Sequence, residues 1–211
     1  MTKIALPLLA ALSLGACTSP GPDKVTVLTT VTETAAAAPQ SEPEECANPD
    51  ARIEDTALFT SSQTVPFHGT DLIGVPTDFS GFLFLFSPAN MESNFDPCLP
   101  LSWAVLHGSN GDAERGPAGT GSSIADVVVF FHYDELITDP APSEIRSIED
   151  VTRLGDTTVQ VIHGHAGRST AEGVTEIYVV DHVWRDGRLV TEGPDAARYE
   201  AVAAETVNLT P

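Results

Sequence analysis

Five runs of β-branched and aromatic residues constrain the fold of this chain more than any other feature. They are bounded by Gly, Asp and Pro and span residues 101–108, 125–132, 157–163, 175–184 and 188–192. Such runs are typical of β-strands. Asp186-Gly187 lies between the last two and suits the two-residue turn of a β-hairpin, because both residue types tolerate positive φ. Connections this short predict an antiparallel sheet of four to five strands.

Two segments outside these runs have helical features. Asn48-Pro49-Asp50 reads as an N-cap followed by proline at the first helical position, which predicts a helix from Pro49 to Phe59. Apolar residues at helical spacing between Asp195 and Glu205 indicate a second, C-terminal helix. We therefore expect an α+β domain in which the N-terminal helix packs on one face of the sheet.

Phenylalanine is concentrated in one part of the chain, because seven of the nine Phe residues lie between Phe59 and Phe95. Phe82, Phe84 and Phe86 alternate with leucines and would project from one side of a strand. A core strand is the simpler interpretation. The alternative is that these three residues form the wall of an apolar ligand pocket or a patch for a protein partner.

The first seventeen residues have the pattern of a secretory signal peptide. Lys3 precedes an eleven-residue apolar stretch from Ile4 to Leu14, which as a helix would rise about 16 Å and is too short to cross a bilayer. Leu14-Gly15-Ala16-Cys17 resembles the bacterial lipobox, in which the cysteine receives a diacylglyceryl group and becomes the new N-terminus. We expect a signal peptide at residues 1–16 and a lipidated Cys17. The alternative is an ordinary signal peptide with a cysteine near its cleavage site.

Residues 17–45 follow as a segment rich in Thr, Ala, Pro and Glu that has no aromatic residue. Such a composition cannot bury enough apolar surface to offset the entropy of ordering, so we expect a disordered tether. The folded domain is expected at residues 46–211. Its two cysteines, Cys46 and Cys98, should form a disulfide in an exported protein, with two free buried thiols as the alternative.

The chain has 10 Lys and Arg against 30 Asp and Glu, which gives a formal net charge of −20. This charge excludes nucleic acid as a partner, because phosphate binding depends on basic side chains. It also excludes electrostatic docking on anionic lipid headgroups, so the expected membrane contact is the lipid on Cys17 alone. The sequence predicts no cofactor and leaves the oligomeric state open.

Several motifs are similar to those of one lipoprotein family. They are Asn94–Trp103 with its Asp-Pro-Cys turn, Gly119–Ser123, Val127–His132 and Thr157–Val161. These residues resemble the LppP/LprE lipoproteins of actinobacteria, and the resemblance runs from Cys46 to Glu192. It implies an extracytoplasmic lipoprotein and brings no established enzymatic activity. The chain departs from the pattern in a longer loop at Ser109–Ala118 and at Leu136–Asp139.

Three histidines are candidates for metal-assisted chemistry. His163 and His165 are at positions i and i+2 of a predicted strand, and His182 lies on a later strand that could adjoin it. Imidazoles suit zinc, but the motif has no second element, and structural histidines are the simpler interpretation. The paired acids Asp134 and Glu135 read equally well as a solvated turn.

We therefore expect a non-catalytic lipoprotein of the cell envelope, held at the extracytoplasmic face of the cell membrane by Cys17 and binding a lipid, a glycan or an envelope protein. The alternative function is an envelope-directed hydrolase, with His163, His165 and His182 holding a metal. Neither reading identifies catalytic residues.

Overall fold

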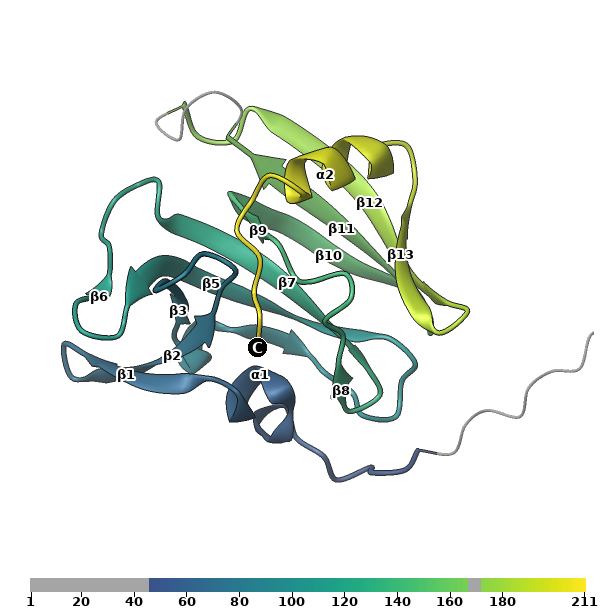
Figure 1. Cartoon of the computed structure of the whole chain (residues 1–211). Helices are drawn as coiled ribbons and strands as arrows, with labels where there is room; N and C mark the ends of the chain where they lie inside the picture. The colour runs from purple at the N-terminus through teal and green to yellow at the C-terminus, as the bar shows by residue number, and fades with distance from the viewer. Residues whose placement is uncertain (1–45, 167–171) are drawn as a thin grey trace, which may run out of the picture. The chain divides into compact units, whose positions relative to one another are not determined.

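Two antiparallel sheets are the main regular structure in the computed structural model, which describes residues 46–166 and 172–211 (Figure 1). The first sheet has nine strands in the order β1-β2-β3-β5-β7-β8, with β4 and β6 paired to β5 and β9 paired to β7. Its strands are β1 (Gln63–Phe67), β2 (Thr70–Pro76), β3 (Leu83–Phe86), β4 (Glu92–Asn94), β5 (Ser102–Asp112), β6 (Gly116–Pro117), β7 (Ile124–His132), β8 (Glu135–Leu136) and β9 (Glu144–Ile145).

The second sheet has four strands in sequence order: β10 (Ser147–Gly155), β11 (Thr158–His165), β12 (Glu176–Arg185) and β13 (Arg188–Glu192). Arg185 pairs with Arg188 across the β12–β13 turn. Asp186 and Gly187 have φ of 54° and 74°, which is the positive φ expected of a two-residue hairpin turn. The sequence predicted this turn correctly.

The predicted α+β fold with a single sheet of four to five strands is wrong. The described residues are mostly β, in sheets of nine and four strands, and their helices are short. They are the 3-10 helices η1 (Ile53–Asp55) and η2 (Pro88–Asn90) and the α-helices α1 (Ala57–Thr60) and α2 (Ala196–Ala203).

The predicted helix from Pro49 to Phe59 does not form, because the backbone is extended inside it. Thr56 has φ −79° and ψ 166°, and its hydroxyl donates to the carbonyl of Ile53 at 2.7 Å. This side-chain bond closes η1 and separates it from α1. Threonine commonly competes with helical bonding in this way. The N-cap at Asn48 therefore leads into a turn and not into a helix.

The sequence analysis did not predict strands β1 and β2, because their residues do not alternate between apolar and polar. β1 is an edge strand of Gln, Thr, Val, Pro and Phe, and only Val65 is buried in it. An edge position tolerates Pro66, because a missing N–H costs nothing where no partner strand needs it. The β1–β2 turn has positive φ at His68 and Gly69.

Strands β5 and β7 are central because both of their faces are apolar. Ala104 and Leu106 of β5, with Val127 and Val129 of β7, face a core that also holds Phe84, Phe86 and Leu209. The alternate residues of the same strands face the second sheet, where they pack on Val159, Val161 and Leu189; they are Trp103, Val105, Val128 and Phe130. Because side chains alternate along a strand, one apolar run serves two cores.

The C-terminal segment joins α2 to the first sheet. Asn208 forms a bridge with Ser143, and Leu209 forms one with Thr77. The Leu209 side chain is buried in the core of the first sheet. Figure 1 shows this yellow segment running from α2, which lies against the second sheet, toward α1.

Cys46 and Cys98 form a disulfide, with their Cα atoms 4.8 Å apart, as the sequence predicted. It ties the start of the described chain to the connection between β4 and β5. The expected signal peptide, the expected tether and Cys17 all lie outside the described residues. Within the described residues, no helix is both long and apolar enough to span a membrane.

Candidate functional site

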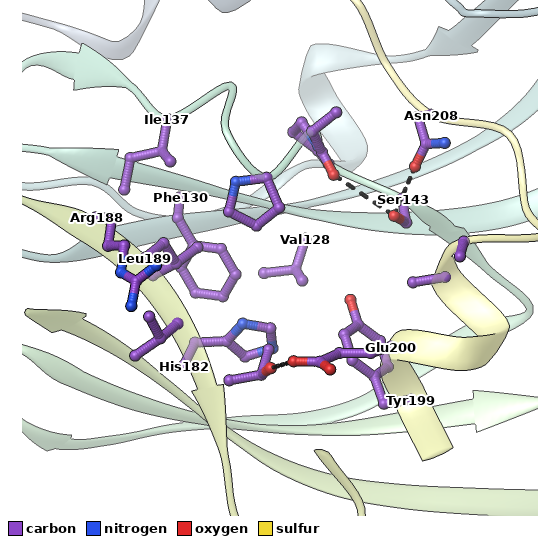
Figure 2. Close-up of a pocket in the computed structure, with 17 residues that line it drawn as sticks. Val128, Phe130, Ile137, Ser143, His182, Arg188, Leu189, Tyr199, Glu200 and Asn208 are labelled. Carbon is purple, nitrogen blue, oxygen red and sulfur yellow. Dashed lines mark hydrogen bonds between the residues drawn. The ribbon is translucent and has the colours of Figure 1, made fainter. Parts of the chain in front are cut away.

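A cavity lies where the two sheets meet α2, and we call it the intersheet pocket (Figure 2). Its volume is about 540 Å³, within the range of small-molecule sites. Most of the lining is apolar and comes from β7, β13 and α2, including Val128, Phe130, Ile137, Leu189, Val190 and Tyr199. The segment Pro140–Ser143 closes another side. The polar members are Ser143, His182, Arg188, Thr191, Glu200 and Asn208.

Strand geometry explains the apolar wall. Val128 and Phe130 are two residues apart on β7 and so project from the same face, toward the second sheet. Phe130 stacks at a tilt on His182 of β12, with ring centroids 4.5 Å apart. In Figure 2, Phe130 and Val128 lie between Ile137 and His182. The pocket is thus a gap in the packing between the sheets, and an imidazole is part of its wall.

His182 and His163 form a buried pair on the face of the second sheet that looks toward Tyr199. Their Nε2 atoms are 3.2 Å apart, and the side chains are 3% and 1% exposed. Burial lowers the pKa of His163 to about 3 and holds the pKa of His182 well below 6.5, with a further contribution from His163. Both rings are therefore neutral at pH 7.

The helix α2 covers this pair through Tyr199. The Tyr199 ring stacks on His163 with centroids 4.2 Å apart and meets His182 edge-on at 5.7 Å. Burial raises the pKa of Tyr199 to about 12. The helix is held in place at its start, where the Asp195 carboxylate accepts a hydrogen bond from the Val179 N–H at 3.1 Å. These contacts position the side of α2 that lines the pocket.

The three histidines that the alternative function would use to hold a metal are only partly brought together. β11 pairs with β12, as the sequence suggested; the register puts His163 opposite Tyr178 and His182 opposite Val159, and the two imidazole rings meet through their Nε2 atoms. His165 does not join them: among residues 46–166 and 172–211, no group of three or more His, Cys, Asp or Glu side chains could hold a metal ion. The described part of the chain therefore contains two imidazoles in contact, without a third ligand of these types.

The phenylalanines proposed as a ligand wall lie elsewhere. Phe84 and Phe86 are 0% and 1% exposed and belong to the core of the first sheet. Phe82 precedes β3 and is 43% exposed, with its ring 5.1 Å from that of the exposed Phe79. None of the three lines the intersheet pocket.

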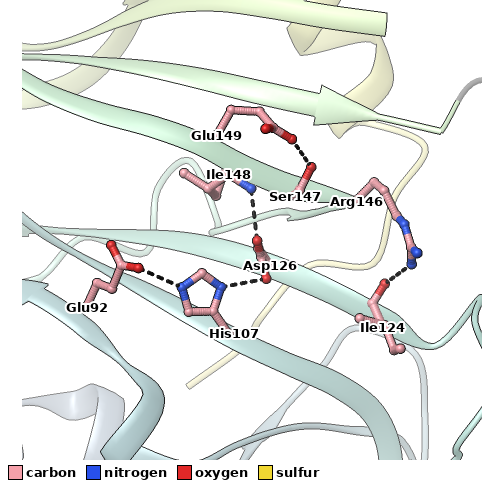
Figure 3. Close-up of polar contacts among 8 residues, drawn as sticks. All are labelled: Glu92, His107, Ile124, Asp126, Arg146, Ser147, Ile148 and Glu149. Carbon is pink, nitrogen blue, oxygen red and sulfur yellow. Dashed lines mark hydrogen bonds and ion pairs between the residues drawn. The ribbon is translucent and has the colours of Figure 1, made fainter. Parts of the chain in front are cut away.

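A second cavity, of about 330 Å³, is polar and lies beside β4, β5 and β10. Its lining includes Glu92, Asn94, Trp103, His107, Glu149 and Asp150. His107 is held between two carboxylates (Figure 3): Nδ1 lies 2.9 Å from Asp126 Oδ1 and Nε2 lies 3.3 Å from Glu92 Oε1. Burial lowers the pKa of His107, but the hydrogen bonds and charges of Asp126 and Glu92 outweigh it and raise the pKa above 6.5.

Asp126 also links the sheets, since its Oδ2 accepts a hydrogen bond from the Ile148 N–H of β10 at 2.9 Å. The side chains of β4, β5 and β7 are thereby connected to the second sheet through one carboxylate (Figure 3). Both ring nitrogens of His107 face carboxylate oxygens, an arrangement that favours the protonated ring and gives this histidine a structural role. The intersheet pocket remains the stronger candidate site.

Sequence reasoning missed the intersheet pocket because its lining comes from many separate segments between Val128 and Asn208. No local motif marks it. The one sequence feature that belongs to this region is the pair His163 and His182, which the sequence analysis placed on adjoining strands as candidate metal ligands.

Comparison with curated proteins and with solved structures gave no significant match. A family model does match: that of the LppP/LprE lipoproteins, over residues 93–187. The matched span runs from β4 to the β12–β13 turn and includes Phe130, His163 and His182. Residues 93–187 of the chain are thus similar to the LppP/LprE lipoproteins.

Proposed function

We propose that this lipoprotein is held at the extracytoplasmic face of the cell membrane by a diacylglyceryl group on Cys17 and that its β domain binds an apolar small molecule in the intersheet pocket. The family match supports a lipoprotein. Two acyl chains give stable membrane attachment, whereas a single chain is marginal. The lipobox-like Leu14–Cys17 sequence is the basis for the anchor.

The single observation that carries the binding function is a cavity of about 540 Å³ with a largely aliphatic and aromatic lining. Burial of an apolar ligand there is favoured by roughly 25 cal/mol for each Å² removed from water. Such a pocket suits a lipid-like molecule better than a glycan, which would need many hydrogen-bonding partners for its hydroxyl groups. A protein partner would need an exposed patch and not a gap between two sheets.

The binding function is tested with the apolar dye N-phenyl-1-naphthylamine, whose fluorescence rises in apolar surroundings. The mature full-length chain should bind it. Ala203 lines the pocket from α2, so Ala203→Trp should fill the cavity and weaken binding at least tenfold. Ala201 is exposed on the same helix, so Ala201→Trp is the matched control and should bind like the wild type. Equal binding by the two variants would exclude this pocket as the site.

The anchor is tested separately by Cys17→Ser in the producing cell. Detergent phase partitioning should move the protein from the detergent phase to the aqueous phase, and mass spectrometry of the wild-type N-terminal peptide should find two acyl chains on the cysteine. A wild-type chain that retains Met1, or that carries a free thiol at Cys17, would contradict the proposed anchor.

A further inference from the structure

The connection between β2 and β3 carries two exposed phenylalanine side chains, and we call it the aromatic turn (residues 77–82). Phe79 is 59% exposed and Phe82 is 43% exposed, and their rings meet edge-to-face with centroids 5.1 Å apart. A Cβ atom added to Gly81 would have no heavy atom within 4 Å, apart from those of the adjacent residues. The described residues therefore leave this pair of rings in water, which is unfavourable for large apolar side chains.

Hydrogen bonds hold the aromatic turn in one conformation. The Phe82 N–H donates to the Phe79 carbonyl at 3.0 Å, and Gly81 supplies a φ of 86°, as the third residue of a type II turn does. At the base of the turn, the Asp78 N–H donates to the Asn208 carbonyl at 2.9 Å. The Asp78 carboxylate accepts from the Asn208 N–H at 3.0 Å and from Nδ2 at 2.9 Å. A partner of the two rings thus meets a preformed loop, which lowers the entropy cost of binding.

Two observations favour a lipid bilayer over a protein as that partner. At about half exposure the two rings offer roughly 200 Å², whereas a stable protein interface buries about 800 Å² on each side. Asn208, which holds the base of the turn, also lines the intersheet pocket. The aromatic turn therefore lies beside the wall of the proposed apolar site, and Figure 1 shows the β2–β3 connection next to the yellow C-terminal segment.

The length of the chain before Cys46 brings the bilayer within reach. The tether expected at residues 17–45 joins the proposed acyl chains on Cys17 to the β domain. A flexible segment of this length has an end-to-end distance of roughly 30 Å. It gives an effective concentration of the order of mM for a second contact with the same membrane. Weak insertion of two rings is then sufficient, because the anchor has already brought the protein to the surface.

We propose that Phe79 and Phe82 insert into the interfacial layer of the bilayer that holds Cys17 and so keep the intersheet pocket close to the membrane. This contact rests on the proposed anchor and is additional to it. The chain has no Lys or Arg between Arg52 and Arg115, so this part of it offers no attraction to anionic headgroups. Burial of apolar surface drives the contact, at the depth of about 5 to 10 Å that is typical of interfacial segments.

The test uses the acylated mature chain in vesicles of dioleoylphosphatidylcholine, a zwitterionic lipid. Ser80→Cys carries a nitrobenzoxadiazole label between the two rings, and Asp156→Cys carries the same label in the exposed β10–β11 turn as the control. Spin labels on the lipid acyl chains should quench the label at residue 80 several-fold more than the label at residue 156. The difference should be the same at low and at high salt, because the contact is apolar.

Variants connect the quenching to the rings. Phe79→Ser combined with Phe82→Ser should reduce quenching of the residue-80 label to the level of the residue-156 label. Leu154→Ser changes a side chain of β10 that is 54% exposed. It is the matched control and should leave the quenching unchanged. Equal quenching at residues 80 and 156 without these substitutions would overturn the inference, and that comparison does not depend on the folding of the double variant.

The remaining outcomes identify which proposal fails. Loss of the acylated chain from the vesicles would overturn the anchor and this inference together. Equal quenching in protein that stays with the vesicles would overturn this inference alone, and naphthylamine binding in solution would still test the pocket. Shielding of the residue-80 label without lipid, increasing with protein concentration, would show that the aromatic turn contacts a second copy of the chain and not the bilayer.

Discussion

Tyr199 stacks on His163, with ring centroids 4.2 Å apart, and this contact connects the C-terminal helix to the buried face of the second sheet. The tyrosine is 9% exposed and also lines the intersheet pocket. One side chain therefore helps to hold the domain together and to form the proposed binding site.

Replacing Tyr199 with alanine should remove this contact and leave a cavity beside His163. The expected loss is about 3 kcal/mol in the free energy of unfolding, measured by urea denaturation. Tyr199→Phe keeps the ring and should change the free energy by no more than about 0.5 kcal/mol. Equal destabilisation by both variants would mean that the hydroxyl, and not the stacking, provides the stability.

Glu144 should make the domain less stable as the pH rises. Burial raises the pKa of this carboxyl from 4.5 to about 7, although a hydrogen bond from Asn110 Nδ2 lowers it in part. A raised folded-state pKa gives stability below pH 4.5, which is lost as the pH rises through 7. Glu144→Gln keeps an acceptor for Asn110 and should stabilise the domain at pH 8 by roughly 2 to 3 kcal/mol relative to the wild type.

At pH 4 the difference between Glu144→Gln and the wild type should be close to zero, because the wild-type carboxyl is then protonated in both states. Thermal or urea unfolding at the two pH values measures it. Glu205→Gln, at an exposed position, is the control and should follow the wild type. A constant difference at pH 4 and pH 8 would show that Glu144 does not titrate as described.

The disulfide should contribute substantially to stability, because it closes a loop of 52 positions. Cys46→Ser combined with Cys98→Ser should lower the free energy of unfolding by about 4 kcal/mol on the chain-entropy argument. Denaturation of the double variant, compared with the oxidised wild type, gives the value. Unchanged stability would mean that the bond constrains neither the native nor the unfolded chain.

Phe82 and Phe84 should contribute differently to stability, because Phe84 is buried in the core and Phe82 is exposed. Phe84→Ala should cost about 3 to 5 kcal/mol of stability, because the side chain is fully buried. Phe82→Ala should cost less than about 1 kcal/mol, since that ring is 43% exposed. Naphthylamine binding by Phe82→Ala should equal that of the wild type. Weaker binding of the dye by Phe82→Ala would indicate that the ligand site is at Phe82 and not in the intersheet pocket.

The sequence predicted those parts of the fold that depend on neighbouring residues. The Asp186-Gly187 turn, the runs that became β5, β7, β11, β12 and β13, and the C-terminal helix all carry local signals. The helix at Pro49–Phe59 failed because a single hydrogen bond of Thr56 overrides the capping pattern. Local preference is a weak guide where a side chain can bond to the backbone instead.

The sequence could not predict that the strands form two separate sheets or that a pocket lies between them. Both depend on which face of β7 meets which strand, and the apolar run of β7 looks alike on both faces. His163 and His182 were placed on adjoining strands correctly, but whether His165 joins them depends on packing that spacing alone does not define.

The placement of Leu209 restricts how a molecule reaches the pocket. The helix α2 is held at its start by the hydrogen bond of Asp195 and, beyond its end, by Leu209, which is buried in the core of the first sheet. It cannot hinge outward as a flap without withdrawing that leucine from the core. An outward swing of α2 is therefore not the route by which a ligand enters the pocket, and shortening the chain before Leu209 should both release the helix and weaken the fold.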